Sequence, residues 1–403
     1  MLTRTDSGTL EQPIEQESAK AMLLFANFGL YHNARLNALK EVCPTHAIEF
    51  AAVQNLYGWQ VNKETTNFTT LYDGAIEQAS IREVLNSCVR LWKTMEGLSP
   101  SHVFVPGYVD VRAVVAAVWA RLHRAQSILM YESTERDRVR TASTEFLKRL
   151  LIRLLFSHGF VGGTRTRQYL EKLKFPPSKL VQKYDIVDND FFTVGCSQCR
   201  NSSKREDWGL PTNYFLFVAR LAEEKNAAGL LEAFTTYRRE GGAWELVLVG
   251  RGGEEANLKS MAAASGFEHV IHFAGFKNAE ELWPFYAFAN CFVLPSKAEP
   301  WGLVVNEAMA SGLPVLVSDA CGCAPDLVHE GKNGFSFNPC DSSQLTRLLH
   351  RLSTLTFEER TAMGNASREI IARFAPSDWG NSAREIMSLW RRPLGLFSRR
   401  TES

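Results

Sequence analysis

The chain has 403 residues, of which 45% are hydrophobic and 22% charged, and its 45 basic and 44 acidic residues leave a formal net charge of +1. This length exceeds one ordinary hydrophobic core and predicts two domains of roughly 200 residues each. The balanced charge gives no electrostatic reason to expect a nucleic-acid partner. No apolar run approaches the roughly 18 residues that a membrane span needs.

The first twenty residues are polar and lack the apolar stretch of a signal peptide, so we expect residues 1–20 to be a mobile leader. We accordingly expect a cytoplasmic protein whose eight cysteines are reduced thiols. Cys196 and Cys199 form one close pair, and Cys321 and Cys323 another. Neither pair has a second half at ordinary zinc-site spacing, which favours incidental cysteines over metal or redox chemistry.

Apolar runs alternate with helical patterns through the first half of the chain. The predicted strands are residues 22–26, 47–51, 102–105, 127–131, 159–161 and 180–184, and the clearest helices are 111–123 and 143–155. Continuously apolar strands separated by helices indicate a parallel sheet covered on both faces. We therefore expect an N-terminal Rossmann-like domain over residues 21–195.

A polar segment follows this domain. Residues 195–212 show no usable periodicity and end near Gly and Pro. Such composition is typical of a connection between domains, so residues 196–212 are expected to form the interdomain linker.

The second half alternates more regularly. Its predicted strands are residues 214–219, 245–249, 270–273, 291–295, 315–318 and 334–337, and its predicted helices are 227–237, 254–264, 279–287, 303–310 and 342–352. This pattern predicts a second doubly wound α/β domain over residues 213–376, with ligands bound beyond the carboxyl ends of its strands. The fold class is therefore α/β, with two doubly wound Rossmann-like domains facing each other across a cleft.

The remaining segment, residues 377–403, contains one more helical pattern at 378–390 and a basic tail. We expect the helix to pack back on the N-terminal domain. The tail is expected to be a frayed basic end, with weak peripheral contact to an anionic membrane surface as the alternative.

Residues 294–315 carry the most informative pattern in the chain. They run from a strand end through a loop into a helix that begins near Leu303, and Gly312 and Pro314 end that helix. Because Gly302 has no side chain, an anion can approach the backbone amides there directly. The amides carry the positive end of the helix dipole, so this turn predicts a phosphate site.

Two carboxylates flank the turn, Glu299 in the loop and Glu307 on the helix. Glu307 lies among apolar residues, and a buried carboxylate needs hydrogen-bond donors such as sugar hydroxyls. The alternative is a solvated helix glutamate beside an ordinary helix cap. The surrounding residues favour the ligand-binding interpretation.

Two cations follow the first strand of the second domain. Arg220 lies at the strand's carboxyl end and Lys225 just before the next helix. With the helix amides, they could hold a diphosphate without Mg²⁺. The alternative for Arg220 is a surface Arg–Glu pair that stabilises the fold by at most about 1 kcal/mol.

Arg220, Lys225 and the Glu299-x7-Glu307 block with Gly302 together resemble the donor site of glycosyltransferase family 4. Members of this family are retaining enzymes of the GT-B fold. The resemblance is strong over residues 214–352 and weaker in the N-terminal half, which would be the acceptor side.

The resemblance implies a role for each matching residue. Arg220 and Lys225 would bind the diphosphate of a UDP- or GDP-linked sugar, and no metal ion is expected. Glu307 would bind the ribose hydroxyls, and Glu299 would face the transferred sugar. The backbone amides offered to phosphate and sugar would be those of Gly302, Leu303 and Val304.

Two further positions of the second domain match the family less closely. Gly250 belongs to a Val-Gly-x-Gly turn in which Arg251 replaces the more familiar acid. Phe276 falls where such enzymes meet the nucleobase. A packed core phenylalanine is an equally good interpretation of Phe276.

In the N-terminal half, the loop after the first strand has Gly29 as its single glycine. His32 and Arg35 lie one turn apart on the next helix, so both could face the cleft. Glu132 follows a later strand, where the family commonly has a cleft-facing histidine, so a histidine role does not transfer. Gly29 and His32 are expected to bind donor, with a purely structural histidine as the alternative for His32.

The resemblance implies transfer with retention of anomeric configuration. We favour a front-face route, in which the diphosphate accepts the acceptor's proton, over a covalent glycosyl-enzyme. The residues expected to serve catalysis are Glu299, Arg220, Lys225 and Glu132. The acceptor would be a glycan, a lipid-linked glycan or a small molecule.

Two alternatives stay open, a nucleotide-sugar epimerase of the same fold and a non-catalytic nucleotide-sugar-binding protein. An NAD-dependent dehydrogenase is disfavoured, because no G-x-G-x-x-G follows an opening strand with an acidic residue about 20 positions later.

Overall fold

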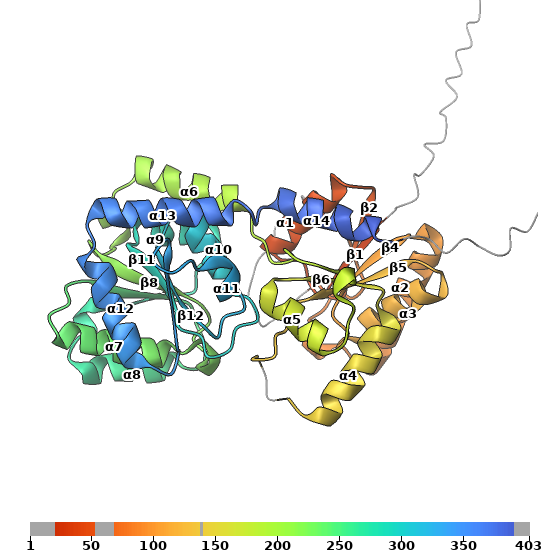
Figure 1. Ribbon diagram of the computed structural model, residues 1–403, viewed down its shortest axis with the longest axis horizontal. Helices are drawn as coiled ribbons and strands as arrows, with labels where there is room; N and C mark the ends of the chain where they lie inside the picture. The colour runs from red at the N-terminus through yellow and green to blue at the C-terminus, as the bar shows by residue number, and fades with distance from the viewer. Residues whose placement is uncertain (1–20, 53–67, 138–139, 391–403) are drawn as a thin grey trace, which may run out of the picture.

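The computed structural model describes residues 21–52, 68–137 and 140–390. The expected leader and basic tail lie outside the described residues. Two parallel sheets with helices on both faces lie side by side (Figure 1). This arrangement is the fold class that the alternating strand and helix patterns predict.

The N-terminal sheet has the strand order β3-β2-β1-β4-β5-β6-β7. Its strands are β1 (Ala21–Phe25), β2 (Thr45–Glu49), β3 (Phe68–Thr70), β4 (His102–Pro106), β5 (Gln126–Tyr131), β6 (His158–Val161) and β7 (Leu180–Val181). Its helices are α1 (Leu30–Lys40), α2 (Ile81–Leu98), α3 (Val111–Leu122), α4 (Ala142–Leu155) and α5 (Thr164–Lys172).

The C-terminal sheet has the order β10-β9-β8-β11-β12-β13. Its strands are β8 (Tyr214–Val218), β9 (Glu245–Val249), β10 (Ile271–Gly275), β11 (Cys291–Leu294), β12 (Val315–Ser318) and β13 (Gly334–Phe337). Its helices are α7 (Ala227–Arg239), α8 (Glu255–Ser265), α9 (Trp283–Phe288), α10 (Leu303–Ala310), α11 (Ala324–Leu327), α12 (Ser342–Thr354) and α13 (Phe357–Ile371).

Burial on both faces explains the apolar composition of the central strands. Every residue of β1 and of β8 is buried. In the C-terminal half, α9 and α10 pack on one face of the sheet and α7 and α12 on the other (Figure 1). The side chains on both faces of such a strand are buried, and each apolar one stabilises the fold. The strand therefore does not alternate between apolar and polar residues.

The predicted linker is wrong over its first seven residues. Residues 196–202 belong to α6 (Asn189–Ser202), which packs against α9 and α10. Phe192 and Cys196, one helical turn apart, are buried, and Arg200 donates from Nε to the carbonyl of Ala287 at 2.8 Å. The sequence pattern hides this helix because polar side chains outnumber its few apolar contacts.

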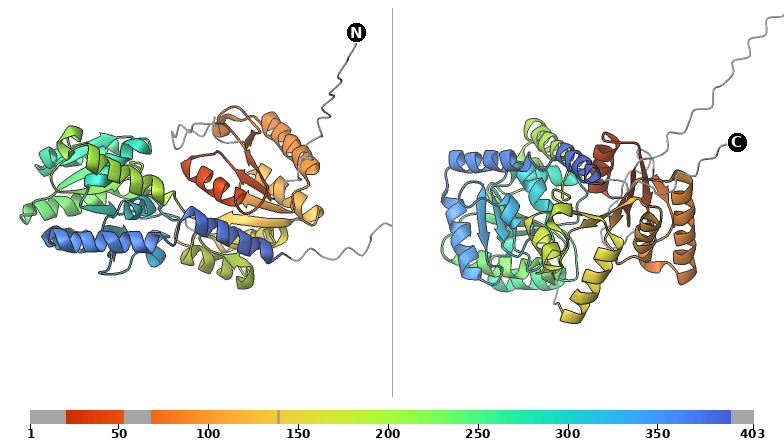
Figure 2. Two further views of the ribbon diagram at one scale, coloured as in Figure 1. Left: turned by 90° about the horizontal axis from the view of Figure 1, so that it is seen from above. Right: turned by 45° about the vertical axis from the view of Figure 1, so that its right-hand side comes forward.

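The last described helix, α14 (Pro376–Ser388), crosses from the C-terminal half and packs against α1 and the N-terminal sheet (Figure 2). Trp379 is fully buried beside Phe160, with ring centroids 5.0 Å apart. Gln126 donates to the carbonyl of Ile386 at 2.7 Å. A buried aromatic anchor therefore ties the C-terminal end of the described chain to the N-terminal domain.

Several elements escaped the sequence patterns, among them α2, α5 and α13. β7 is shorter than expected, with two residues in place of 180–184. Among the described residues, no helix combines the length and the apolar composition that a membrane span requires.

Candidate functional site

The C-terminal sheet reverses its strand order at β8, which pairs with β9 on one side and β11 on the other. Arg220 follows β8, Gly250 follows β9, and the loop of Glu299 follows β11. In open parallel sheets, ligands bind at the carboxyl ends beside such a reversal. The candidate donor residues of this domain therefore lie along the expected edge.

The centre of the site is an ion pair between Lys225 and Glu299. The Lys225 ammonium donates to Oε2 of Glu299, and the two side chains are 15% and 11% exposed. The loops that carry them are joined directly, because the Lys297 amide donates to the carbonyl of Glu224 at 2.8 Å. Asn226, in a left-handed conformation with φ of 56°, adds a hydrogen bond to the carbonyl of Pro295 at 3.1 Å.

Arg220, in the same connection between β8 and α7 as Lys225, contacts the residue that precedes Lys225. Its Nη2 donates to Oε1 of Glu224 at 2.8 Å, and the two side chains are 42% and 41% exposed. This is the surface Arg–Glu pair that the sequence left as the alternative. An exposed pair of this kind stabilises the fold weakly, so an anionic ligand can replace Glu224 as the partner of Arg220 at little cost.

The amino end of α10 lies beside Glu299. Gly302 adopts φ of 106°, and a Cβ there would lie 3.1 Å from Cδ2 of Leu294 and 3.4 Å from Cγ of Glu299. The amides of Leu303 and Val304 stand in the first turn, where a helix has no internal acceptors for its N–H groups. Glycine thus allows the turn that presents these amides.

Glu307, one turn further along α10, is 1% exposed. Its Oε1 accepts a short hydrogen bond from the Tyr31 hydroxyl, and its Oε2 accepts from the Tyr286 hydroxyl at 2.7 Å. Burial raises the pKa of Glu307 to about 7. A solvated helix glutamate is therefore excluded, and both carboxylate oxygens have phenol partners in this structure.

Gly250 and Phe276 lie on the far side of β8. The Gly250 amide donates to the carbonyl of Gly275 at 2.9 Å, which joins the turns after β9 and β10. A Cβ on Gly250 would lie 1.8 Å from the carbonyl oxygen of Ala219, and its φ is 143°. Phe276 is half-buried in the turn after β10, next to this contact.

The N-terminal candidates behave differently. Gly29 is the N-cap of α1, and its amide donates to Nδ1 of His32 at 2.9 Å. The imidazole stacks on Phe25 with centroids 4.1 Å apart, and burial lowers the pKa of His32 to about 3. His32 is therefore neutral at pH 7, with one ring nitrogen held by the turn.

Glu132 follows β5, is about half exposed, and lies 4.0 Å from the guanidinium of Arg35. Arg35 is 1% exposed and donates to the fully buried Asp185 at 3.1 Å. The guanidinium of Arg35 also packs over the ring of Tyr184 at 4.1 Å, so Arg35 is held by residues of its own domain. Burial, with the nearby Glu132 carboxylate, raises the pKa of Asp185.

The two halves touch along this edge. Thr164, at the amino end of α5, donates from its hydroxyl and its amide to Asp326 at 2.6 and 3.0 Å. Arg165 donates to the carbonyl of Cys321 at 2.8 Å, and Asn306 to the carbonyl of Asp185 at 3.4 Å. The Tyr31–Glu307 hydrogen bond joins the same two domains.

The candidates thus form two groups. Lys225 and Glu299 are in contact, with the Gly302 turn beside Glu299 and Arg220 in the same connection between β8 and α7, whereas the half-exposed Glu132 lies beside the buried Arg35 of the N-terminal domain. Sequence reasoning missed Tyr31 and Tyr286, whose hydroxyls hold Glu307. Tyr31 lies 276 positions from Glu307 in the sequence, and Tyr286 lies 21 positions from it. No periodic pattern relates residues at these separations. The cysteines are free thiols, and no described cluster of His, Cys, Asp and Glu is placed to hold a metal ion.

Comparisons with known proteins show the class of fold. Residues 200–370 match the family model described as glycosyl transferases group 1. The structure of HepE from Anabaena in complex with UDP superposes with a TM-score of 0.72 at 18% identity, covering 92% of this chain and all of that one. The chain therefore has the GT-B fold, and its C-terminal domain is similar to that of group 1 glycosyl transferases.

Two curated relatives are informative. An uncharacterised glycosyltransferase of Methanocaldococcus jannaschii is 31% identical over 227 residues, which are 56% of this chain and 57% of the relative. The alpha-D-kanosaminyltransferase of Streptomyces kanamyceticus is 23% identical over 287 residues, 69% of this chain and 74% of the relative. The chain spans about half the length of several of the curated relatives that it matches.

Proposed function

We propose that this protein is a retaining glycosyltransferase that transfers a sugar from a UDP- or GDP-linked donor to an acceptor without a metal ion. The observation that carries the proposal is the arrangement at the β8 reversal. Lys225 is paired with Glu299, Arg220 is half-exposed in the same connection between β8 and α7, and the amino end of α10 adjoins Glu299. Neighbours of the same fold have been crystallised with UDP and with UDP-glucose, which supports a nucleotide-sugar donor.

The two cations and the α10 amides supply the positive charge that a departing diphosphate needs. Such groups stabilise a leaving group best when they are fixed before the reaction. Lys225 is held by Glu299, and the Gly302 turn is braced by the buried Trp301, whose indole donates to Asn306 at 3.0 Å. We infer a front-face route in which the acceptor hydroxyl attacks C1 as the C1–O bond to the diphosphate breaks. The proton passes to the departing phosphate oxygen.

The proposal assigns Glu299 to the transferred sugar. With one oxygen on Lys225, the carboxylate keeps acceptor capacity for a sugar hydroxyl. Glu307 is assigned to the ribose. In that role the ribose hydroxyls would replace a phenol, since Tyr31 and Tyr286 hold the two carboxylate oxygens in this structure.

The experiment is a thermal-shift panel of nucleotide sugars followed by product analysis. A ligand at one hundred times its Kd stabilises the folded state by about 2.7 kcal/mol, which raises the melting temperature measurably. We expect a shift with a UDP- or GDP-sugar in wild type, and its loss in the Arg220→Ala/Lys225→Ala double variant. Each stabilising donor is then incubated with and without candidate acceptors, and released nucleoside diphosphate is measured. Epimerised donor without acceptor, or binding without release of diphosphate under any condition, would refute a transferase.

A further inference from the structure

Helix α4 carries an exposed apolar stripe. Phe146, Leu147, Leu150 and Leu154 are 68%, 64%, 57% and 63% exposed. At about 100° per residue, these four side chains span an arc of about 100° on one side of the helix. The opposite side is the packed one, with Ile152 buried at 1% exposure. Isolated exposed leucines are ordinary, whereas a continuous stripe on one helix indicates a binding surface.

Two arginines border the stripe. Arg149 and Arg153 lie one turn apart on the edge of the arc next to Phe146, and Arg153 is exposed. Neither has an ion-pair partner within the described part of the chain, in contrast to Lys148, which is paired with Glu145 at 2.8 Å. The stripe with its cationic border is the composition of a helix that lies in the plane of a membrane surface.

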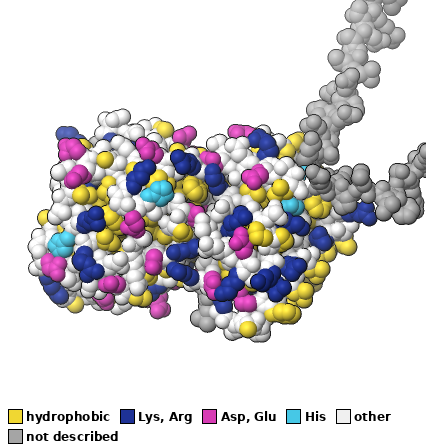
Figure 3. Space-filling model, in the orientation of Figure 1, with side chains coloured by type: hydrophobic (Ala, Val, Ile, Leu, Met, Phe, Trp, Pro, Cys, Tyr) yellow, Lys and Arg dark blue, Asp and Glu magenta, His cyan; other side chains and the backbone are white. Residues whose placement is uncertain are grey.

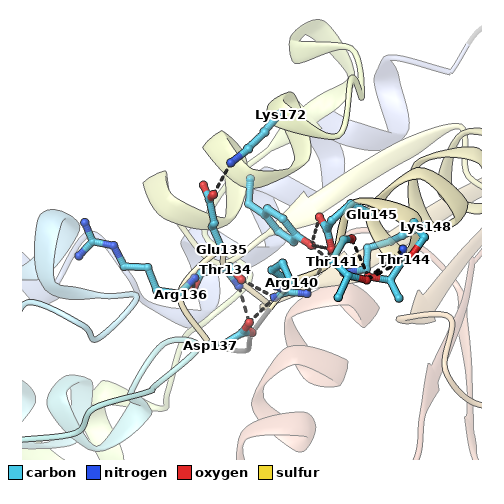
Figure 4. A network of polar contacts seen from close by, with 12 residues as sticks. Thr134, Glu135, Arg136, Asp137, Arg140, Thr141, Thr144, Glu145, Lys148 and Lys172 are labelled. Atoms are coloured by element: carbon cyan, nitrogen blue, oxygen red, sulfur yellow. Dashed lines mark hydrogen bonds and ion pairs between the residues drawn. The ribbon is translucent and has the colours of Figure 1, made fainter.

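The inner side of α4 is fixed by a polar network, shown in Figure 4. Glu145 accepts from the Tyr169 hydroxyl at 2.7 Å, and Lys148 donates to that hydroxyl at 2.6 Å. Arg140 packs over the Tyr169 ring at 4.7 Å and pairs with Asp137. Because α5 holds one side of α4 in this way, the apolar stripe is a fixed outward feature.

The network also shows which charges remain available. A hollow of about 240 Å³ between α4 and α5 is lined by Arg140, Arg149 and Lys172 among others. Arg140 is paired with Asp137, and Lys172 with Glu135. Arg149 at its rim and Arg153 beyond it are therefore the cations that α4 can offer to an external anion.

We propose that α4 docks this protein on an anionic lipid surface, with Phe146, Leu147, Leu150 and Leu154 inserted at the headgroup boundary and Arg149 and Arg153 on lipid phosphates. A space-filling view shows hydrophobic side chains along the lower right margin of the N-terminal domain, with basic side chains beside them (Figure 3). Self-association through the same stripe is disfavoured. In an antiparallel two-fold contact the arginine-bordered edges of the two copies lie on the same side, so like charges would be brought together.

This inference rests on the proposed function and extends it to the acceptor. The segment that leads into α4 begins at Glu132, after β5, and Arg136 in it donates to the carbonyl of Asp319 of the C-terminal domain at 3.3 Å. The segment that precedes α4 therefore touches the C-terminal domain at the edge where the two domains meet. A membrane bound at α4 would present a lipid-linked acceptor to that edge.

The experiment is flotation of the full chain with vesicles, using phosphatidylcholine alone and phosphatidylcholine with phosphatidylglycerol. We expect flotation with the mixed vesicles, weaker binding to phosphatidylcholine, and loss at high salt. Arg149→Glu/Arg153→Glu should weaken partitioning by at least about thirtyfold, given roughly fivefold per basic residue at an anionic surface. Leu150→Ser/Leu154→Ser should weaken it by at least tenfold, because the apolar area that enters the boundary is lost.

Matched variants control for charge and for surface hydrophobicity. Arg239→Glu/Arg347→Glu makes the same charge change on exposed residues of the C-terminal domain. Ile81→Ser/Leu85→Ser removes an exposed apolar pair from α2, 82% and 59% exposed. Both should float as wild type does. Equal losses in these controls, no flotation by wild type, or an α4-dependent dimer in light scattering would overturn the inference.

The outcome is separable from the proposed function. The α4 variants should keep the donor-induced thermal shift of wild type, because no α4 residue lies at the β8 reversal. They should lose activity on a lipid-linked acceptor in vesicles while keeping it on the same acceptor in detergent. Flotation without any donor binding would sink the transferase proposal alone, and donor binding without flotation would sink the lipid proposal alone.

Discussion

The two cleft-facing edges of this protein are built alike and charged differently. At the C-terminal edge, Arg220 is half-exposed and has one weak partner. At the N-terminal edge, Arg35 is 1% exposed and bound to the buried Asp185. The same parallel-strand geometry thus supplies an exchangeable cation on one side and a neutralised one on the other. Strand ends alone predict where charges gather, and burial decides whether a ligand can use them.

The largest effect is expected from removing the cations of the C-terminal edge, Arg220 and Lys225. Arg220→Ala/Lys225→Ala should lower turnover by three orders of magnitude or more, since removal of one fixed donor from a developing anion typically costs a hundredfold or more. The measurement is steady-state release of nucleoside diphosphate. Near-normal turnover would mean that the C-terminal edge carries no catalytic charge.

A matched control uses Lys225→Arg, which keeps the charge beside Glu299. It should fold as wild type does and retain more activity than the double variant. Removal of Lys225 also leaves a largely buried carboxylate without its ion-pair partner, so unfolding curves must accompany the kinetics.

A second prediction concerns the backbone of the same edge. Gly250→Ala should lower the free energy of unfolding by about 3 kcal/mol or more. The new Cβ would lie 1.8 Å from the Ala219 carbonyl oxygen, at a φ of 143° that alanine rarely adopts. Urea denaturation checks it. Gly253→Ala, in open space three residues after Gly250, should change stability by under about 1 kcal/mol.

A third prediction concerns Glu307, whose carboxylate accepts a hydrogen bond from Tyr31 of the other domain. The pKa of Glu307 is about 7 in the folded protein and 4.5 in the ordinary carboxyl group. Between those values the folded state binds the extra proton, so stability falls as pH rises from about 4.5 to 7. Above that range both states are ionised, and below it both are protonated. At about 1.4 kcal/mol per unit, the loss reaches about 3 kcal/mol.

Glu307→Gln has no carboxyl proton to lose, so it should show a flatter stability profile over that pH range. The difference between wild type and variant, from urea unfolding at several pH values without nucleotide, isolates this group from the other titrating residues. Parallel profiles would show that Glu307 is not held protonated by its surroundings.

The smallest expected effect on stability is at Glu132. Glu132→Gln should change the free energy of unfolding by under about 1 kcal/mol, because the side chain is about half exposed and 4.0 Å from Arg35. The effect of Glu132→Gln on turnover tests whether the N-terminal edge takes part in catalysis. A fall of a hundredfold or more would make Glu132 a catalytic group, and a fall under about threefold would leave it a partner of Arg35 only.

The elements with the strongest patterns were predicted well. The predicted strands at 245–249 and 315–318 and the helix at 303–310 match the observed bounds. These segments are continuously apolar or end at glycine, so local chemistry defines them. The predicted linker failed because α6 is stabilised by its contacts with α9 and α10, which local composition does not record.

The site shows the same division. The sequence predicted that Arg220, Lys225 and Glu299 would meet, because strand ends of one sheet converge. It gave the surface pairing of Arg220 with a glutamate only as an alternative, and it did not predict that phenols would hold Glu307. Those contacts depend on side-chain rotation and on the docking of one domain against the other. Neither side-chain rotation nor domain docking produces a periodic pattern in the sequence.

The Tyr31–Glu307 hydrogen bond has a consequence for how a nucleotide would enter. Tyr31 belongs to the N-terminal domain and Glu307 to the C-terminal domain. A ribose hydroxyl that donates to the Glu307 carboxylate would therefore compete with the Tyr31 hydroxyl, whose hydrogen bond connects the two domains. A hydrogen bond to a charged group is worth about 1.5–3 kcal/mol. Donor affinity would then be lowered roughly ten- to a hundredfold relative to a free carboxylate, and nucleotide binding would be thermodynamically linked to separation of the domains.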